Sequence, residues 1–204
     1  MSKVRTRLPP DERRKLILEV AFKALAHEGF EGLRTRDIAA AAGINSATLH
    51  HYFETKQDLI EGIAEHLEHR LRTERAPSAP DDEPDPFARQ FEDLLFYHKK
   101  SPEILAVYRE LVARAPRDAA IRTLVVRLHS SWKAGIVSSL SHARAQGLLR
   151  EDLDPDAAAG LVLSTAWGLL AQIFLSPAEL KAAAAQLRIL LQAPAATRAR
   201  SRKV

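Results

Sequence analysis

The segment from Ser46 to Phe53 is rich in hydrogen-bonding side chains and contains no acidic residue. Its polar members are Ser46, Thr48, His50, His51 and Tyr52. Hydroxyl and imidazole groups can bond to phosphate oxygens and to base edges, and the lack of carboxylates avoids repelling an anionic partner. This composition suits contact with a nucleic acid. The alternative is an ordinary pair of helices whose polar face is only solvated.

Two short helices joined at Gly43 are expected to position these side chains. Residues 35–56 read TRDIAAAAGINSATLHHYFETK. Thr35 is the expected N-cap of the first helix, with Asp37 in its first turn, where the helix dipole favours negative charge. Gly43 permits the positive φ that such turns often need. Asn45 is the expected cap of the second helix.

The second helix is predicted to bury one face and expose the other. Leu49 and Phe53 lie four residues apart and form the inward face. The 100° step per residue places four residues on the opposite face and its flanks: Ala47, His51, Thr48 and His50. This arrangement is that of a helix-turn-helix, whose second helix is free to enter a DNA major groove.

Two longer helices are predicted to flank this pair. The first spans residues 11–28 and ends at Gly29, with a buried stripe of Ile17, Val20, Ala21 and Ala24. The second begins at its expected cap Thr55 and runs to about Arg75. Its inward residues are Leu59, Ile60, Ile63 and Leu67.

The run from Leu16 to about Leu67 resembles the DNA-binding domain of the TetR family of bacterial repressors. The resemblance lies in AHEGFEGLRTRDIA, AGINSATLHHYF and TKQDLI, which follow one another in the family's order. It implies that the phosphate contacts are Thr35, Thr48, Tyr52 and Lys56. It also implies that the base-facing residues are Arg36, Ser46, Ala47, His50 and His51. Asn45 belongs to the same expected DNA-binding surface, and His50 stands where the family usually has tyrosine.

Composition narrows the classes of function. The chain of 204 residues has an apolar fraction of 46% and no cysteine, so disulfides, thiolate metal sites and cysteine nucleophiles are excluded. It contains no HExxH, GxSxG or glycine-rich phosphate loop, so neither an enzyme nor a cofactor is predicted. The N-terminal segment lacks the apolar region of a secretory signal, and a cytoplasmic location is expected.

Positive charge is concentrated at the two ends of the chain. Residues 1–10 carry +3 and the tail 193–204 carries +4, whereas the whole chain has a net charge of +4. The body between them therefore has a net charge of −3, so general attraction to DNA should be modest. The N-terminal arm could contact phosphate or the minor groove, or it could be a disordered solubilising end.

The predicted fold is all-α, with about nine helices in two domains. Residues 1–54 form the three-helix DNA-binding domain, and residues 55–204 form an effector-binding and dimerisation domain. Helix 55–75 connects the two, and residues 193–204 form a basic tail. The proline-rich acidic segment 76–86 is the expected linker. Further helices are expected at 86–100, from Pro102 onward with Ser101 as its N-cap, at 118–146, at 157–175 and at 178–192.

The last two helices are expected to form a dimer interface, as the family resemblance implies in layout. The expected interface residues are Gly160, Ser164, Gly168, Leu180, Ala184, Leu187 and Leu191. Residues 157–175 are uncharged over a length close to that of a membrane span. A membrane anchor is therefore an alternative, but polar residues dilute the run, and a helix buried on nearly all faces is also apolar all round. No membrane contact is predicted.

The sequence offers candidate residues for a small-molecule pocket and for a metal site. The candidate pocket residues are Phe91, Tyr97, Tyr108, His129, Trp132 and Trp167, although residues of these types are more often plain core. His66 and His69, with Glu65, could hold a metal, but no third ligand is evident and a solvated helix face is favoured.

The sequence therefore predicts a homodimeric regulator that binds double-stranded operator DNA. Repression is expected, with release by a small apolar or aromatic effector. The alternatives are a helical DNA-binding regulator without a small-molecule ligand and, more remotely, a membrane-anchored helical protein or an enzyme.

Overall fold

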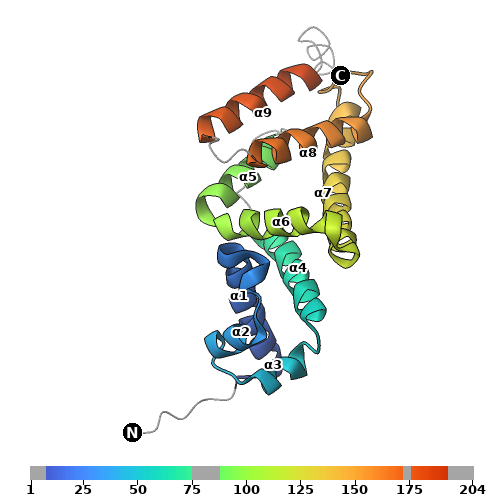
Figure 1. The fold of residues 1–204 in the computed structure, drawn as a ribbon. Coiled ribbons are helices and arrows are strands. Elements are labelled where there is room, and N and C mark those ends of the chain that lie inside the picture. Colours follow the sequence, from blue (N-terminus) through green and yellow to red (C-terminus); the bar gives the residue numbers. More distant parts are fainter. Residues whose placement is uncertain (1–7, 75–87, 172–175, 193–204) are drawn as a thin grey trace. The chain divides into compact units, whose positions relative to one another are not determined.

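The computed structural model describes residues 8–74, 88–171 and 176–192, and within them the chain is helical with no strand (Figure 1). The prediction of an all-α chain with about nine helices is confirmed. The α-helices are α1 (Pro10–Glu28), α2 (Thr35–Ala41), α3 (Ser46–Tyr52), α4 (Lys56–Thr73), α5 (Ala88–Lys100), α6 (Pro102–Arg114), α7 (Ala119–Ala145), α8 (Pro155–Ala171) and α9 (Pro177–Leu191). Two short 3-10 helices are η1 (Gly29–Gly32) and η2 (Ala115–Arg117). The expected linker 76–86 and the basic ends 1–7 and 193–204 lie outside the described residues.

The chain divides into two compact units. The first comprises residues 1–74 and 101–125, and therefore holds α1 to α4, α6 and the start of α7. The second comprises residues 75–100 and 126–204. The connecting helix α4 thus packs with the N-terminal helices. The functional division between residues 54 and 55 stays a prediction.

The core of the first unit forms where α1 packs against α4 and α6. In α4 the predicted inward residues Leu59, Ile60, Ile63 and Leu67 are all buried. In α1 the buried residues are Ile17, Leu18, Ala21, Phe22 and Leu25. The predicted stripe was wrong for Val20 and Ala24, which are half-buried, because two neighbouring helices cover α1 and the larger side chains fill that space.

Glycine at position 62 allows α4 to approach α1 closely. A Cβ atom placed on Gly62 would lie 2.8 Å from Leu18 Cδ2 and 3.0 Å from Phe53 Cε1. Leu18 and Phe53 are themselves buried and have little room to move. Because Gly62 has no side chain, α4 can lie this close to α1 and to Phe53, the residue that follows α3.

Helix ends in the first unit show which predicted caps are correct. The Thr48 N–H donates to Asn45 Oδ1 at 2.7 Å, so the predicted cap of α3 is confirmed. Thr55 caps α4 through a reciprocal capping box with Asp58. The prediction for Thr35 was wrong. The helix begins at Thr35, its N-cap is Arg34, and no side chain caps it.

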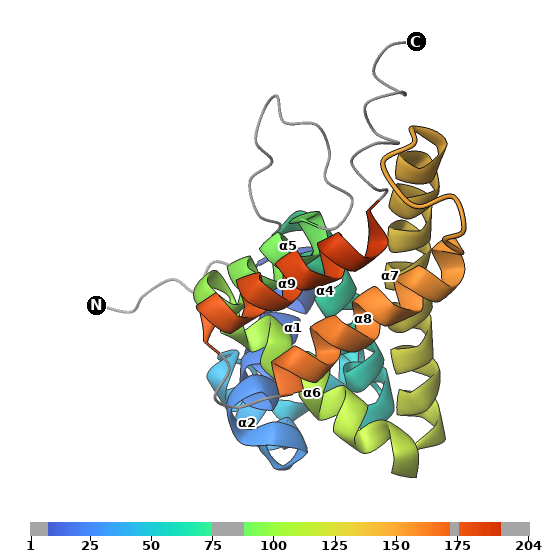
Figure 2. The ribbon, with the colours of Figure 1, turned by 90° about the horizontal axis from the view of Figure 1, so that it is seen from above.

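The second unit holds α5, most of α7, α8 and α9. Helix α9 lies alongside α8 and packs on α5 (Figure 2). Lys133 Nζ donates to Asp156 Oδ2 at 2.6 Å and ties α7 to α8. Between the same helices, the rings of Trp132 and Trp167 meet edge to face with centroids 4.9 Å apart. In the part of the chain that the structure describes, every helix falls short of the combined length and apolarity that a bilayer crossing requires.

Substitution of Gly62 by alanine should destabilise the protein, although alanine favours helices. We expect the free energy of unfolding to fall by about 1–2 kcal/mol, because the new methyl group overpacks buried side chains. Gly135→Ala is the matched control, since its Cβ would meet no atom within 4 Å. It should raise the free energy of unfolding by about 0.5–1 kcal/mol through helix propensity. Urea titration of both variants tests this, and equal shifts would contradict it.

Candidate nucleic-acid interface

Helices α2 and α3 pack against each other through a tight turn at Gly43. The φ of Gly43 is 66°, in the left-handed region that favours glycine. The Gly43 N–H bonds to the Ala40 carbonyl at 3.0 Å, and the Ile44 N–H bonds to the Ala39 carbonyl at 2.9 Å. These two bonds form a Schellman motif, which closes α2 and fixes the direction in which the chain enters α3.

Helix α3 is anchored on one side and open on the other. Leu49 and Phe53 are 1% and 2% exposed, whereas Ala47, His50 and His51 are exposed. Ser46, Thr48 and Tyr52 are half-buried. The edge of the His51 ring meets the Tyr52 ring at a centroid distance of 5.5 Å. The predicted sidedness of this helix agrees with the structure, and its contacts with DNA stay predictions.

A shallow hollow next to α2 gathers the other predicted contact residues. Its volume is about 510 Å³, and Thr35, Arg36 and Lys56 line it together with Arg34 and Asp37. The Lys56 Nζ also donates to the Phe30 carbonyl at 3.3 Å. Three cations face one carboxylate here, so the hollow is positively charged. Such a surface suits phosphate oxygens.

Sequence reasoning missed Arg34 as a member of this hollow. The sequence feature that could have indicated it is the run LRTR, in which Arg34 stands directly before Thr35, the expected N-cap. Asn45, in contrast, was expected on the DNA-binding surface, but its side-chain oxygen is engaged in capping α3. The structure therefore gives Asn45 a positioning role, which orients the first turn of α3.

A polar cluster joins the far part of α4 to α1 and α6. His66 Nε2 lies 3.1 Å from Glu19 Oε2 of α1, and its ring meets the Phe22 ring edge to face. The guanidinium of Arg70 lies 4.8 Å from the centroid of the same Phe22 ring. His66 is thus paired with a carboxylate of α1, whereas His69 is exposed.

Glu74 links this cluster to α6. Arg70 Nη2 donates to Glu74 Oε2 at 3.0 Å, and this hydrogen bond holds the pKa of Glu74 below its usual range. Ser101 Oγ donates to the same oxygen at 2.6 Å. The prediction that the side chain of Ser101 caps α6 was therefore wrong. The residue stands at the N-cap, but its hydroxyl bonds to Glu74.

The candidate pocket residues fall into both compact units. Tyr108 lies in the first unit, and Tyr97, His129, Trp132 and Trp167 lie in the second. Tyr97 is 1% exposed and Tyr108 is 4% exposed, and burial raises the pKa of Tyr108 to about 12. His129 and the two tryptophans are half-buried, and the side chain of Phe91 lies outside the described residues.

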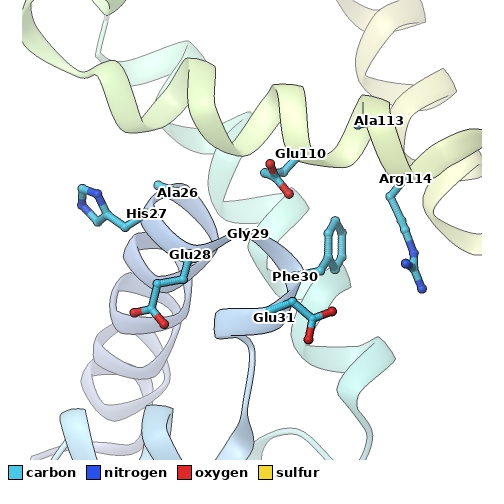
Figure 3. Close-up of a pocket in the computed structure, with 9 residues that line it drawn as sticks. All are labelled: Ala26, His27, Glu28, Gly29, Phe30, Glu31, Glu110, Ala113 and Arg114. Carbon is cyan, nitrogen blue, oxygen red and sulfur yellow. The ribbon is translucent and has the colours of Figure 1, made fainter.

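A separate hollow of about 500 Å³ opens between the end of α1, η1 and α6 (Figure 3). Glu28, Glu31 and Glu110 contribute carboxylates to its lining. The Arg114 guanidinium lies 5.6 Å from the centroid of the Phe30 ring. Sequence reasoning had named none of these residues as ligand contacts.

The candidate dimer residues behave differently on the two last helices. On α8, Ser164 and Gly168 are exposed, and a Cβ on Gly160 or Gly168 would meet no atom within 4 Å. Leu161 on this helix is 57% exposed. The face of α8 that carries these residues is therefore open to another helix.

On α9, three of the four candidate residues are buried inside the chain. Leu180, Leu187 and Leu191 are 2%, 9% and 6% exposed, and Ala184 is half-buried. These leucines face the core because α9 packs on both α5 and α8. The outward apolar residues of α9 are instead Ile189 and Leu190, which are 65% and 66% exposed.

Comparison with known proteins gives matches along most of the chain. Residues 17–63 match the family model of bacterial regulatory proteins of the tetR family. Residues 87–200 match the model of the C-terminal part of BetI-type transcriptional repressors. The HTH-type transcriptional repressor KstR2 of Mycolicibacterium smegmatis is 25% identical over 167 residues, which cover 78% of each chain.

Solved structures share the fold. A putative TetR-family transcriptional regulator from Rhodococcus sp. superposes with a TM-score of 0.72 at 26% identity, covering 88% of this chain and 96% of that one. A putative transcriptional regulator from Saccharomonospora viridis, solved in complex with choline, gives a TM-score of 0.67 at 21% identity. That match covers 90% of this chain and 100% of the other.

The burial of His66 beside Arg70 predicts a loss of stability in acid. Burial lowers the pKa of His66 from its ordinary value of 6.5, and the charge of Arg70 adds to this effect, although Glu19 opposes it. The folded state therefore favours neutral His66. Its contribution is fully present above pH 6.5 and is lost as the pH falls through the lowered value.

This pH dependence can be measured by urea unfolding of the wild type and of His66→Gln between pH 7.5 and 5. We expect the wild type to lose more stability on acidification than the variant does. His69→Gln is the matched control, because His69 is exposed on the same helix. Parallel curves for the wild type and His66→Gln would contradict the assignment.

Proposed function

Because this chain belongs to the TetR family of bacterial regulatory proteins and is a DNA-binding transcriptional regulator, we propose that it acts as a homodimeric repressor. Each subunit places α3 in the major groove of one half of a roughly palindromic operator. A small-molecule effector releases the dimer from DNA. Because relatives of this chain are named as repressors, they support repression rather than activation.

One observation carries the proposal: the exposed face of α3 and the cation-lined hollow beside α2 belong to the same helix pair. Ala47, His50 and His51 offer an exposed surface to base edges. Arg34, Arg36 and Lys56 bring positive charge to the hollow. In a helix-turn-helix, backbone contacts fix the register and the recognition helix reads sequence. Thr35, Thr48, Tyr52 and Lys56 hold phosphate, and Asn45 holds the recognition helix in shape.

Arg36 is the cation best placed to read a base. Its side chain is exposed on α2, and arginine pairs with the O6 and N7 atoms of guanine. Lys56, at the start of α4, offers a mobile point charge that suits a phosphate. The two residues therefore make different contributions, one to specificity and the other to general affinity.

Arg36→Ala should weaken binding to the operator by about 1–3 kcal/mol and leave binding to random DNA nearly unchanged. Lys56→Ala should weaken both alike and reduce the slope of affinity against salt concentration by about one ion. Fluorescence anisotropy with both duplexes over a salt series measures these effects. Equal losses on operator and random DNA for Arg36→Ala would rule out its reading role.

The two-fold symmetry of an operator calls for a dimer, which we place on α8 and α9. The open glycines of α8 allow close helix approach, and Leu161 adds an exposed apolar side chain. On α9 the contribution comes from Ile189 and Leu190, since the leucines expected there are buried in the chain. Ile189 and Leu190 are adjacent in the chain, and exposed apolar side chains that lie together support an interface.

Ile189→Glu should convert the dimer into monomers, because it places a charge in the proposed interface. Operator binding should then fall at least tenfold, as the second half-site no longer adds to affinity. Val126→Glu is the matched control, since Val126 is similarly exposed but lies on α7. Light scattering measures the mass of each variant. A wild type that is monomeric both free and on DNA would contradict the proposed dimer.

The effector is proposed to bind among the helices of the second unit. The structural neighbour from Saccharomonospora viridis was solved with choline, which supports a small-molecule site in proteins of this fold. The half-buried His129, Trp132 and Trp167 offer aromatic surface for a small apolar or aromatic molecule, and Tyr97 is buried in the same unit. Release from DNA then requires that the effector bind the DNA-free conformation of the protein more tightly than the DNA-bound conformation. A regulator without such a ligand remains the alternative, and a screen for compounds that release the operator separates the two.

A further inference from the structure

His50, near the end of the recognition helix, has one ring nitrogen within hydrogen-bonding distance of a backbone carbonyl. Its ring atom Nδ1 lies 3.3 Å from the carbonyl oxygen of Glu54, four residues ahead. A backbone carbonyl can only accept, so Nδ1 must carry the hydrogen and donate it. In the neutral ring the other nitrogen, Nε2, then has a lone pair and acts as an acceptor.

The direction of Nε2 follows from the shape of the ring. The lone-pair and N–H directions of the two nitrogens diverge, so a ring that points Nδ1 at the backbone turns Nε2 away from it. The side chain of His50 is exposed, which leaves room for a partner at Nε2. His51, the next residue, instead meets Tyr52 with its ring. The two neighbouring histidines are thus held by different contacts.

We propose that His50 reads its base as an acceptor and selects adenine or cytosine. In the major groove the only base donors are the N6 amino group of adenine and the N4 amino group of cytosine. Guanine and thymine present acceptors and a methyl group there, which leave the lone pair of Nε2 unpaired. The inference rests on the proposed function, because it requires α3 to lie in the major groove.

The experiment uses the full chain and an operator duplex selected from random DNA. In each half-site, every adenine is replaced in turn by purine riboside, which lacks the N6 amino group, and every cytosine by a 2-pyrimidinone nucleoside, which lacks the N4 amino group. Dissociation constants are measured for the wild type and for His50→Phe. The variant sees the same altered duplex, so any weakening of the base pair itself cancels.

At one position per half-site, loss of the amino group should lower wild-type affinity on the order of tenfold. The same change should leave the affinity of His50→Phe unaltered. His50→Ala serves as a second variant, and circular dichroism checks the fold of both. As a direct check on the ring, ¹⁵N NMR of the free protein should show the hydrogen of His50 on Nδ1.

Three results would overturn the inference. The first is a hydrogen on Nε2, and the second is coupling of His50 only to the N7 atom of guanine, probed with 7-deazaguanine. The third is the absence of any position at which an amino group and His50 are coupled. If the wild type still prefers its operator and Arg36→Ala loses that preference, only this inference fails. If the wild type shows no preference for any sequence, the proposed function fails with it.

Discussion

Burial of Leu49 and Phe53 is the constraint on which the rest of the structure depends. Helix α3 has seven residues, and a helix of that length is not stable alone in water. Two nearly fully buried side chains hold it against the first unit, and the Asn45 cap and the Gly43 turn set its start. Phe53 in turn packs where Gly62 leaves room for it. The exposed residues Ala47, His50 and His51 are therefore not needed to hold α3 in place and are available for contacts with a partner.

Helix α4 connects this surface to the polar cluster at its other end. Its first residue, Lys56, lines the cationic hollow. Arg70 in its last turn donates to Glu74, and Ser101 before α6 donates to the same Glu74 oxygen. His66 joins the middle of the same helix to Glu19 of α1. The hydrogen bonds to Glu74 connect the start of α6 to the helix that carries a proposed phosphate contact. This is a contiguous physical route from the end of α4 to the DNA-facing surface within one compact unit.

Local signals in the sequence predicted the helices and most of their ends, and long-range contacts account for some of the errors. Asn45, Thr55 and Gly43 act on residues within three positions, so their roles could be derived from spacing alone. The Ser101 hydroxyl could not, because its partner Glu74 lies 27 residues away. The candidate interface leucines of α9 are buried within the chain itself, which spacing alone could not show because the helix is apolar on more than one side. Arg34 was overlooked because Thr35, the stronger cap by residue type, drew the expected helix start one residue late.

The central claim is that the exposed face of α3 reads operator DNA in a symmetric pair. Repeated selection of bound duplexes from a random library, with the purified full chain, tests it most directly. The account predicts enrichment of an inverted repeat whose two half-sites are centred about one helical turn apart or a multiple of it. Enrichment of no sequence, or of a single asymmetric site, would contradict it.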